Sequence, residues 1–113
     1  GLYGPHELSV IIITVRIKTQ PGVYLLSNDA RLVRYVGRSD TDLQARLQDW
    51  TEDYSYFWYG HLDSPLDAFR AECEEFHRYG GKKHLDNDIH PSRPAGSRAM
   101  KCSAFGDLCE ELD

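Results

Sequence analysis

Long apolar runs are missing from this sequence. The most hydrophobic stretch, Val10-Ile11-Ile12-Ile13, is followed within a few residues by Arg16 and Lys18, so it is far shorter than the roughly 20 apolar residues that cross a bilayer. A secretory signal would carry its basic residues before the apolar run, and here they follow it. We therefore expect no membrane partner. We predict a β-strand over Leu8–Lys18, where apolar and polar side chains alternate.

Cysteine is scarce, with three residues in a chain of 113. An odd number argues against a secreted disulfide scaffold and for a reducing, cytoplasmic location. Cys102 and Cys109 lie close together near the C-terminus. A second ligand pair at the spacing of a zinc site is missing from the sequence, so whether these two thiols bind a metal stays open.

An excess of basic residues is also lacking, since the net charge is −5. This balance counts against a nucleic-acid binder, because affinity for phosphates comes from Lys and Arg. The basic residues present are mostly of the type that suits bidentate phosphate contact, with nine Arg against four Lys. A catalytic domain can also leave tight binding to a partner or a flanking module. The charge therefore does not exclude an enzyme that acts on nucleic acid.

The length of the chain limits its organisation. With 113 residues, of which 41% are hydrophobic, it is long enough for one modest core and too short for two ordinary domains. The sequence shows no low-complexity segment or internal repeat. We predict a single domain over residues 1–113, with its core at about residues 19–94, an additional strand before the core and a tail after it.

Two short segments that combine an aromatic residue with glycine are the most informative feature present. Gly22-Val23-Tyr24 and Tyr35-Val36-Gly37 flank a polar, turn-rich stretch, which predicts two strands joined as a hairpin. A symmetric turn centred between residues 29 and 30 would pair Tyr24 directly with Tyr35. Both phenols would then share one sheet face, where nearby basic and acidic side chains could join them in cutting a phosphodiester.

Residues 39–43 are typical of a helix start, because small polar and acidic side chains suit the first positions of a helix. Leu43, Leu47 and Trp50 recur at helical spacing and would form the buried face. Arg46 lies at the edge of that face. Its guanidinium would be held near the sheet and could meet an anion there.

A second helix is predicted from Ser64 to about Tyr79. Ser64 fits an N-cap and Pro65 fits the first helical position. The pair Gly80-Gly81 is a helix stop. These signals predict both ends of the helix.

Glu72 is the acidic residue of this helix that we single out. The apolar stripe consists of four residues: Leu66, Phe69, Cys73 and Phe76. A helix turns by about 100° per residue, which places Glu72 beside the stripe and points Glu74 and Glu75 away from it. A carboxylate at a buried margin is costly without a partner or a cation. Glu72 would therefore either bind a metal or flank the core and pair with an arginine.

Residues 85–94 contain too many turn-forming residues for a regular element and predict an ordered loop. Asn87 and His90 in this loop can both hydrogen-bond a phosphate, although an Asn near a Pro is also ordinary turn chemistry. His77 precedes the loop on the second helix. It could assist proton transfer or serve as a satisfied structural histidine.

Taken together, these residues resemble the GIY-YIG nuclease superfamily, whose domain also forms the N-terminal catalytic part of the bacterial nucleotide-excision-repair endonuclease. Valine replaces isoleucine in both triplets, which is a conservative change. Five pieces in the right order carry the resemblance, which covers residues 21–94. They are Gly22-Val23-Tyr24, Tyr35-Val36-Gly37-Arg38-Ser39, Leu43-Gln44-Ala45-Arg46-Leu47, the helix around Ala68 and Glu72, and Leu85-Asp86-Asn87. The chain also resembles a small, mostly standalone prokaryotic branch of this family.

The resemblance implies an α+β fold, with a small central antiparallel β-sheet flanked by helices. It implies that Tyr24 and Tyr35 are paired phenols, one of which orients or deprotonates the attacking water. Arg38 and Arg46 would bind the scissile phosphate. Glu72 would hold a single Mg²⁺ or Mn²⁺ ion.

Two further residues receive roles from the resemblance. Asn87 would contact the phosphate or support the metal site, and His77 matches the pattern of the branch. The leading hypothesis is a metal-dependent endonuclease acting on DNA, with RNA not excluded, as a monomer or a homodimer. The alternative is a catalytically silent nuclease-like module that binds nucleic acid or protein. The predicted aromatic strand over residues 56–62 and Tyr54 before it would then supply partner surfaces, or pack as ordinary core.

Overall fold

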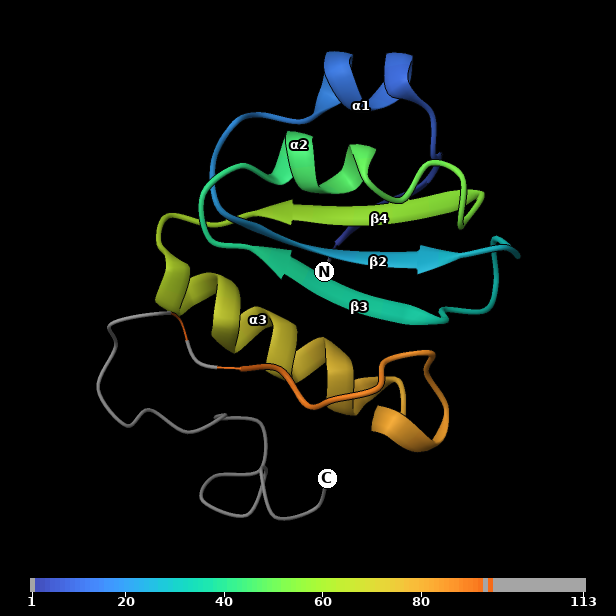
Figure 1. Ribbon diagram of the computed structural model, residues 1–113, viewed down its shortest axis with the longest axis vertical. Helices are drawn as coiled ribbons and strands as arrows, with labels where there is room; N and C mark the ends of the chain where they lie inside the picture. Colours follow the sequence, from blue (N-terminus) through green and yellow to red (C-terminus); the bar gives the residue numbers. More distant parts are fainter. Residues whose placement is uncertain (1, 93, 95–113) are drawn as a thin grey trace.

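The computed structural model describes residues 2–92 and 94. The fold is α+β, with a four-stranded antiparallel sheet flanked by helices, as predicted (Figure 1). Cys102 and Cys109 lie outside the described residues. In chain order the elements are β1 (Tyr3–Glu7), α1 (Val10–Arg16), β2 (Gly22–Ser27), β3 (Tyr35–Ser39), α2 (Leu43–Gln48), β4 (Tyr56–His61), α3 (Pro65–Arg78) and a 3₁₀ turn (Gly81–Lys83).

Strand β2 lies inside the sheet, whose order is β1-β4-β2-β3. Each of its six residues is buried, because other elements cover both faces of the strand. Strand β3 forms one edge of the sheet and β1 the other. None of the helices in the described part of the chain has the length and apolar character that a membrane span requires.

The hairpin between β2 and β3 forms, but its predicted register is wrong. Tyr24 lies opposite Gly37, and Tyr35 lies opposite Leu26. The reason is the turn, which is built from Asp29 to Leu32 and so is centred one residue later than expected. The Asp29 carboxylate accepts the backbone N–H of residue 31 at 2.9 Å and fixes this turn. The resulting shift of two residues leaves Tyr24 and Tyr35 on the same sheet face, because side chains alternate with a period of two.

The predicted strand over Leu8–Lys18 is also wrong, because most of this segment is helix α1. The side chain of Ser9 accepts the N–H of Ile12 at 3.3 Å and caps the helix. Ile13 and Ile17, four residues apart, are both buried, whereas Val15 is 79% exposed. The apolar side chains therefore follow the helical period and not the alternation of a strand. The additional N-terminal strand is β1 instead.

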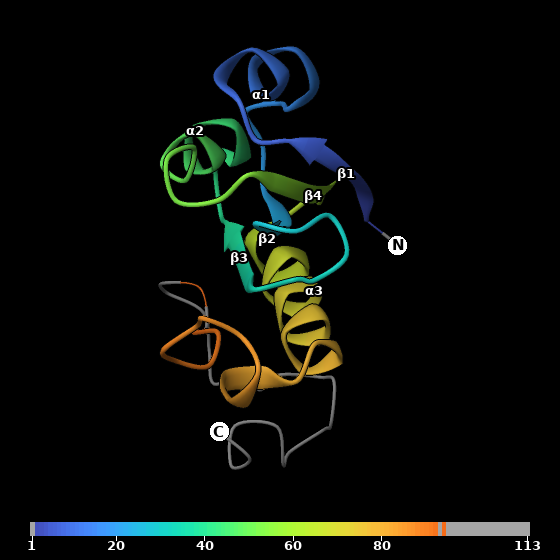
Figure 2. The same ribbon diagram turned by 90° about the vertical axis from the view of Figure 1, so that its right-hand side faces the viewer.

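The helices pack on both faces of the sheet (Figures 1 and 2). Helices α1 and α2 cover one face, where they bury a cluster made of Leu8, Ile13, Ile17, Tyr24, Leu26, Leu43, Leu47 and Phe57. Helix α3 covers the opposite face, where Phe76 packs in a second cluster with Leu25, Val33, Val36 and Leu85. The side chains of β2 alternate between the two clusters, as a strand between two layers requires.

Helix α3 has the predicted ends. The Ser64 hydroxyl accepts the N–H of Asp67 at 3.1 Å, and Pro65 is the first helical residue. Gly80 follows the helix with a φ of 97°, which is the left-handed conformation that glycine adopts readily.

The buried face of α3 is rotated relative to the predicted stripe. Leu66, expected to be buried, is 39% exposed. Glu75, expected to point away, is only 7% exposed, and its Oε1 lies 3.8 Å from Nη1 of Arg78. Burial raises the pKa of Glu75. The buried surface extends to Ala68, Glu72 and Glu75, which lie above one another at helical spacing.

Candidate functional site

The two tyrosines come together at the β3 edge of the sheet. The rings of Tyr24 and Tyr35 lie nearly parallel, with their centroids 6.4 Å apart and an interplanar angle of 21°. Tyr24 is 1% exposed, and its hydroxyl accepts the indole N–H of Trp50 at 2.9 Å. Tyr35 is half-buried and packs against the Trp50 ring at 4.6 Å between centroids. Helix α2 leads into Trp50, so that residue ties the tyrosine pair to the helical layer.

Gly37 explains how the buried Tyr24 phenol reaches the edge strand. Tyr24 lies opposite Gly37 in the register of the hairpin. A Cβ atom at Gly37 would overlap the Cζ and hydroxyl oxygen of Tyr24. The glycine of the second triplet is therefore required by the close approach of a ring and not by an unusual backbone conformation.

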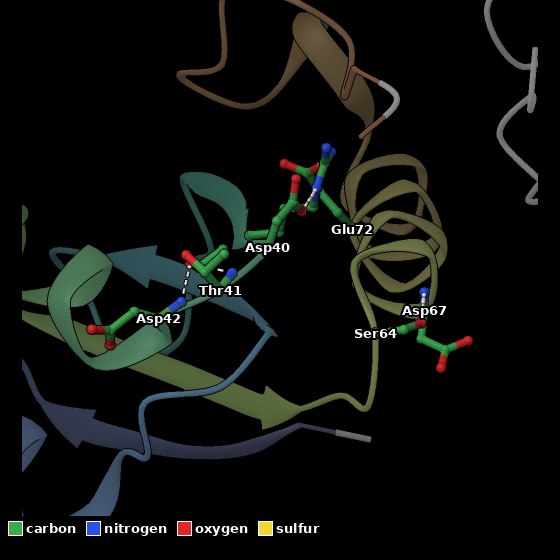
Figure 3. Close-up of polar contacts among 8 residues, drawn as sticks. Asp40, Thr41, Asp42, Ser64, Asp67 and Glu72 are labelled. Carbon is green, nitrogen blue, oxygen red and sulfur yellow. Dashed lines mark hydrogen bonds and ion pairs between the residues drawn. The ribbon is translucent and has the colours of Figure 1, made fainter. Parts of the chain in front are cut away.

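Arg38 points to the opposite face of the sheet, where it lies between two carboxylates. Its Nη1 donates to Oε1 of Glu72 at 2.6 Å, and its Nε donates to Oδ1 of Asp40 at 2.7 Å. Figure 3 shows Asp40, after β3, and Glu72, on α3, approaching one another from different elements. The guanidinium carbon also lies 5.2 Å from the centre of the Phe69 ring. This ion-pair network joins the edge strand to α3.

The sequence left two interpretations of Glu72 open, a metal ligand or a partner of an arginine, and its position in this network is compatible with both. Glu72 is 8% exposed and pairs with an arginine, as one interpretation expected. It also lines a pocket together with both tyrosines, as a metal ligand would need to. Burial raises the pKa of Glu72 to about 7, and the Arg38 guanidinium opposes that rise. Near neutral pH the carboxyl group is therefore poised between its protonated and ionised forms.

Arg46 reaches the same pocket from α2. The side chain is exposed, and within residues 2–92 and 94 no ion pair engages its guanidinium. Arg46 thus differs from Arg38, which is already held by two carboxylates. An anion that entered the pocket could therefore bind Arg46 without first breaking a salt bridge.

Asn87 completes the edge of the sheet. Its side-chain oxygen accepts the N–H of Val36 at 3.0 Å, and its side-chain nitrogen donates to the carbonyl of Val36 at 2.7 Å. The amide therefore replaces the neighbouring strand that β3 lacks. Asn87 still borders the pocket, so its position supports the site through the edge strand.

The histidines lie at the rim and behind it. His90 borders the pocket, whereas His77 is not among its lining residues. The two Nε2 atoms are 3.1 Å apart, and both rings pack edge-on against Phe76. His77 therefore contacts the pocket through His90 and holds the loop against α3.

These side chains surround one open pocket of about 270 Å³ at the β3 edge. Seven of the eight residues singled out from the sequence line it, and His77 is the exception: Tyr24, Tyr35, Arg38, Arg46, Glu72, Asn87 and His90. The sequence analysis missed Asp40, for which the signal was its place two residues after Arg38, next to the helix start. It also assigned Trp50 only to a core face, although its indole N–H is a polar group that needs a partner when buried.

Comparisons of the chain with protein-family models, with curated proteins and with solved structures found no match. The fold and site define an α+β domain with a polar pocket in which two arginines, two carboxylates and two phenols converge at the edge of an antiparallel sheet.

Proposed function

We propose that this chain is a divalent-metal-dependent endonuclease of the GIY-YIG kind, which hydrolyses phosphodiester bonds in DNA. One observation carries the proposal. Tyr24, Tyr35, Arg38, Arg46 and Glu72 come from four different elements and line one open pocket. The resemblance assigns these same residues to water, phosphate and metal, although it was based on order along the chain and not on distance.

The pocket fits the Mg²⁺ or Mn²⁺ that the resemblance implies. Mg²⁺ prefers hard oxygen ligands and keeps several waters, so one or two carboxylates suffice. Glu72 and Asp40 both line the pocket. In the part of the chain that the structure describes, no three His, Cys, Asp or Glu side chains gather to form a complete protein cage. Glu72 would hold the ion, which supplies Lewis-acid polarisation of a phosphoryl oxygen when bound.

The arginines bind and position the phosphate. Arg46 presents an exposed guanidinium at the pocket, which suits bidentate contact with phosphate oxygens. Arg38 is held in place by Asp40 and Glu72 through two of its three nitrogens. Its remaining N–H groups can donate to an oxygen on which negative charge develops. Donors fixed in advance at such a place are an effective source of rate enhancement.

The tyrosines orient the attacking water. Burial raises the pKa of Tyr24 and of Tyr35, so both phenols keep their protons near neutral pH. The Tyr24 oxygen already accepts from Trp50, which leaves its own O–H available as a donor. This protonation state favours an orienting role over direct deprotonation of water by either phenol.

The alternative, a catalytically silent module that binds nucleic acid or protein, is favoured by the Arg38–Glu72 ion pair itself. The pair occupies one expected phosphate ligand and the expected metal ligand at 2.6 Å. In a silent module divalent metal would neither bind Glu72 nor promote cleavage. The two functions therefore differ in their response to metal.

The test is cleavage by the full chain of supercoiled, linear, branched and single-stranded DNA, with RNA of the same sequence for comparison. Each substrate is incubated with Mg²⁺, with Mn²⁺ and with a chelator. The proposal predicts cleavage that needs the metal and that the chelator abolishes. Binding without cleavage under every condition would assign the chain to the silent module.

A further inference from the structure

A second hollow lies beside the pocket and shares part of its wall. Its volume is about 530 Å³, and its walls include the aromatic rings of Tyr35, Trp50 and Tyr54. Tyr35, Asn87 and Ile89 border both hollows. We call this second hollow the aromatic groove. A polymer whose phosphate lay in the pocket would have its neighbouring group at the entrance to the groove.

The three rings of the groove are held in fixed positions. Tyr35 and Trp50 pack at 4.6 Å between centroids, and Tyr54 lies 5.9 Å from Trp50 and 6.3 Å from Tyr35. The Tyr54 hydroxyl donates to Asp86 at 2.8 Å, and Arg34 binds the same carboxylate at 2.8 Å. Trp50 and Tyr54 are thus anchored through their polar atoms and Tyr35 through ring contacts. Each ring is only half-buried, so part of its surface stays accessible.

The charge of the groove differs from that of the pocket. Arg38 and Arg46 line the pocket, whereas the groove has Asp86 and Asp88 and no basic residue among its described walls. Asp86 is already paired with Arg34, and Asp88 is exposed. Such walls disfavour a phosphate. They suit a flat, uncharged group whose exocyclic amino group can donate to a carboxylate.

We propose that the aromatic groove binds an unpaired nucleobase of the strand whose phosphate occupies the pocket. Base stacking on aromatic side chains tolerates any sequence because every base has a π-face. A base inside a continuous duplex is stacked and paired, so it could enter the groove only after it leaves the helix. The substrate class is therefore DNA that is single-stranded or locally unpaired beside the cut. This inference rests on the proposed function and deepens it.

The test measures binding separately from cleavage. Trp58→Phe leaves Trp50 as the only tryptophan, so its fluorescence reports on the groove. A short single-stranded oligodeoxynucleotide, the same strand in a perfect duplex, and a strand of equal length made of abasic residues are titrated in chelator. Tyr54→Leu removes the ring, and Tyr54→Phe keeps the ring but loses the hydroxyl. Circular dichroism and thermal unfolding confirm that both variants fold.

The proposal predicts that the intact single strand quenches Trp50 and binds at least tenfold more tightly than the abasic strand, because stacking contributes about 1–3 kcal/mol per base. Tyr54→Leu should lose about tenfold in affinity for the intact strand and little for the abasic strand. Tyr54→Phe should stay within about threefold of the parent. Equal binding of intact and abasic strands, or equal effects of the two substitutions, would overturn the proposal.

Cleavage in Mn²⁺ by the same preparations separates the two proposals. Equal cutting of duplex and single strand, with Tyr54→Leu as active as its parent, would overturn the base-binding groove and leave the nuclease intact. Quenching by the intact strand without cleavage in any metal would support the groove and refute the nuclease.

Discussion

Arg38 and Glu72 form an ion pair of 2.6 Å across the edge of the sheet, although 34 residues separate them in the chain. The pair joins β3 to α3 and lies where the resemblance places a phosphate ligand and a metal ligand. Removing one partner of a largely buried pair leaves an uncompensated charge. In the proposed nuclease Glu72 would hold the divalent cation, and its bond to Arg38 would keep the remaining N–H groups of that arginine in place for the phosphate.

The stability of the fold should depend on the protonation of Glu72. Burial raises the pKa of Glu72 from 4.5 to about 7 in the folded chain. The contribution of the protonated carboxyl group to the free energy of unfolding is therefore fully present below the pKa of the unfolded chain, and it is lost as the pH rises through about 7. Relative to Glu72→Gln, the wild type should lose on the order of 1–3 kcal/mol of unfolding free energy between about pH 5 and pH 8. Urea unfolding across this range measures the difference, and a gap that does not change with pH would contradict it.

Gly37→Ala should disturb the tyrosine pair. The added Cβ would overlap the Tyr24 phenol, and such overpacking typically costs about 1–3 kcal/mol of stability. Gly60→Ala is the matched control, because its Cβ would meet the end of the flexible Leu2 side chain. Thermal unfolding of both variants is the measurement. Equal destabilisation would mean that Tyr24 moves aside without cost.

Arg46→Ala should reduce catalysis and leave the fold unchanged. Its guanidinium lines the pocket and makes no ion pair within the described residues. Loss of one preorganised donor to a developing oxyanion typically lowers the rate by about 10²–10³. Single-turnover cleavage measures the effect, with the exposed Arg70 on α3 changed to Ala as the control. If both variants cut equally well, Arg46 does not contact the phosphate.

Asn87→Ala should loosen the open edge of the sheet. Both polar groups of its side chain bond to the backbone of Val36, and an unsatisfied backbone group costs about 1–3 kcal/mol. Amide hydrogen exchange at Val36 should accelerate strongly, while exchange in β4 stays slow. Unchanged protection at Val36 would show that another group replaces the amide.

The sequence predicted the class of fold and most of the pocket, because local signals there agree with tertiary packing. Ser64, Pro65 and Gly80 specify the ends of α3 through capping and backbone conformation alone. The pocket residues lie in segments whose order along the chain carries the resemblance. These local signals were strong enough for the class of fold and the ends of α3 to be confirmed.

The predictions that were wrong depended on contacts that cannot be inferred from single residues. The segment over residues 8–18 fits both a strand and a helix, and the Ser9 cap with the burial of Ile13 and Ile17 decides for the helix. The hairpin register depended on where the Asp29 carboxylate closes the turn. Glu75 is buried because the packed face of α3 is broader than its apolar stripe. The partners of Arg38 and Asn87 required the three-dimensional structure.

The most direct measurement is single-turnover cleavage in saturating Mn²⁺ by Glu72→Gln and Glu74→Gln, compared with the wild type. The two glutamates share a helix, but Glu72 is buried at the pocket and Glu74 is exposed. The nuclease proposal predicts that Glu72→Gln loses at least about 10²-fold in rate, whereas Glu74→Gln stays within about twofold. Circular dichroism confirms the fold of each. Cleavage by Glu72→Gln at the wild-type rate would contradict the account, because the pocket could then not be the place where the phosphodiester is cut.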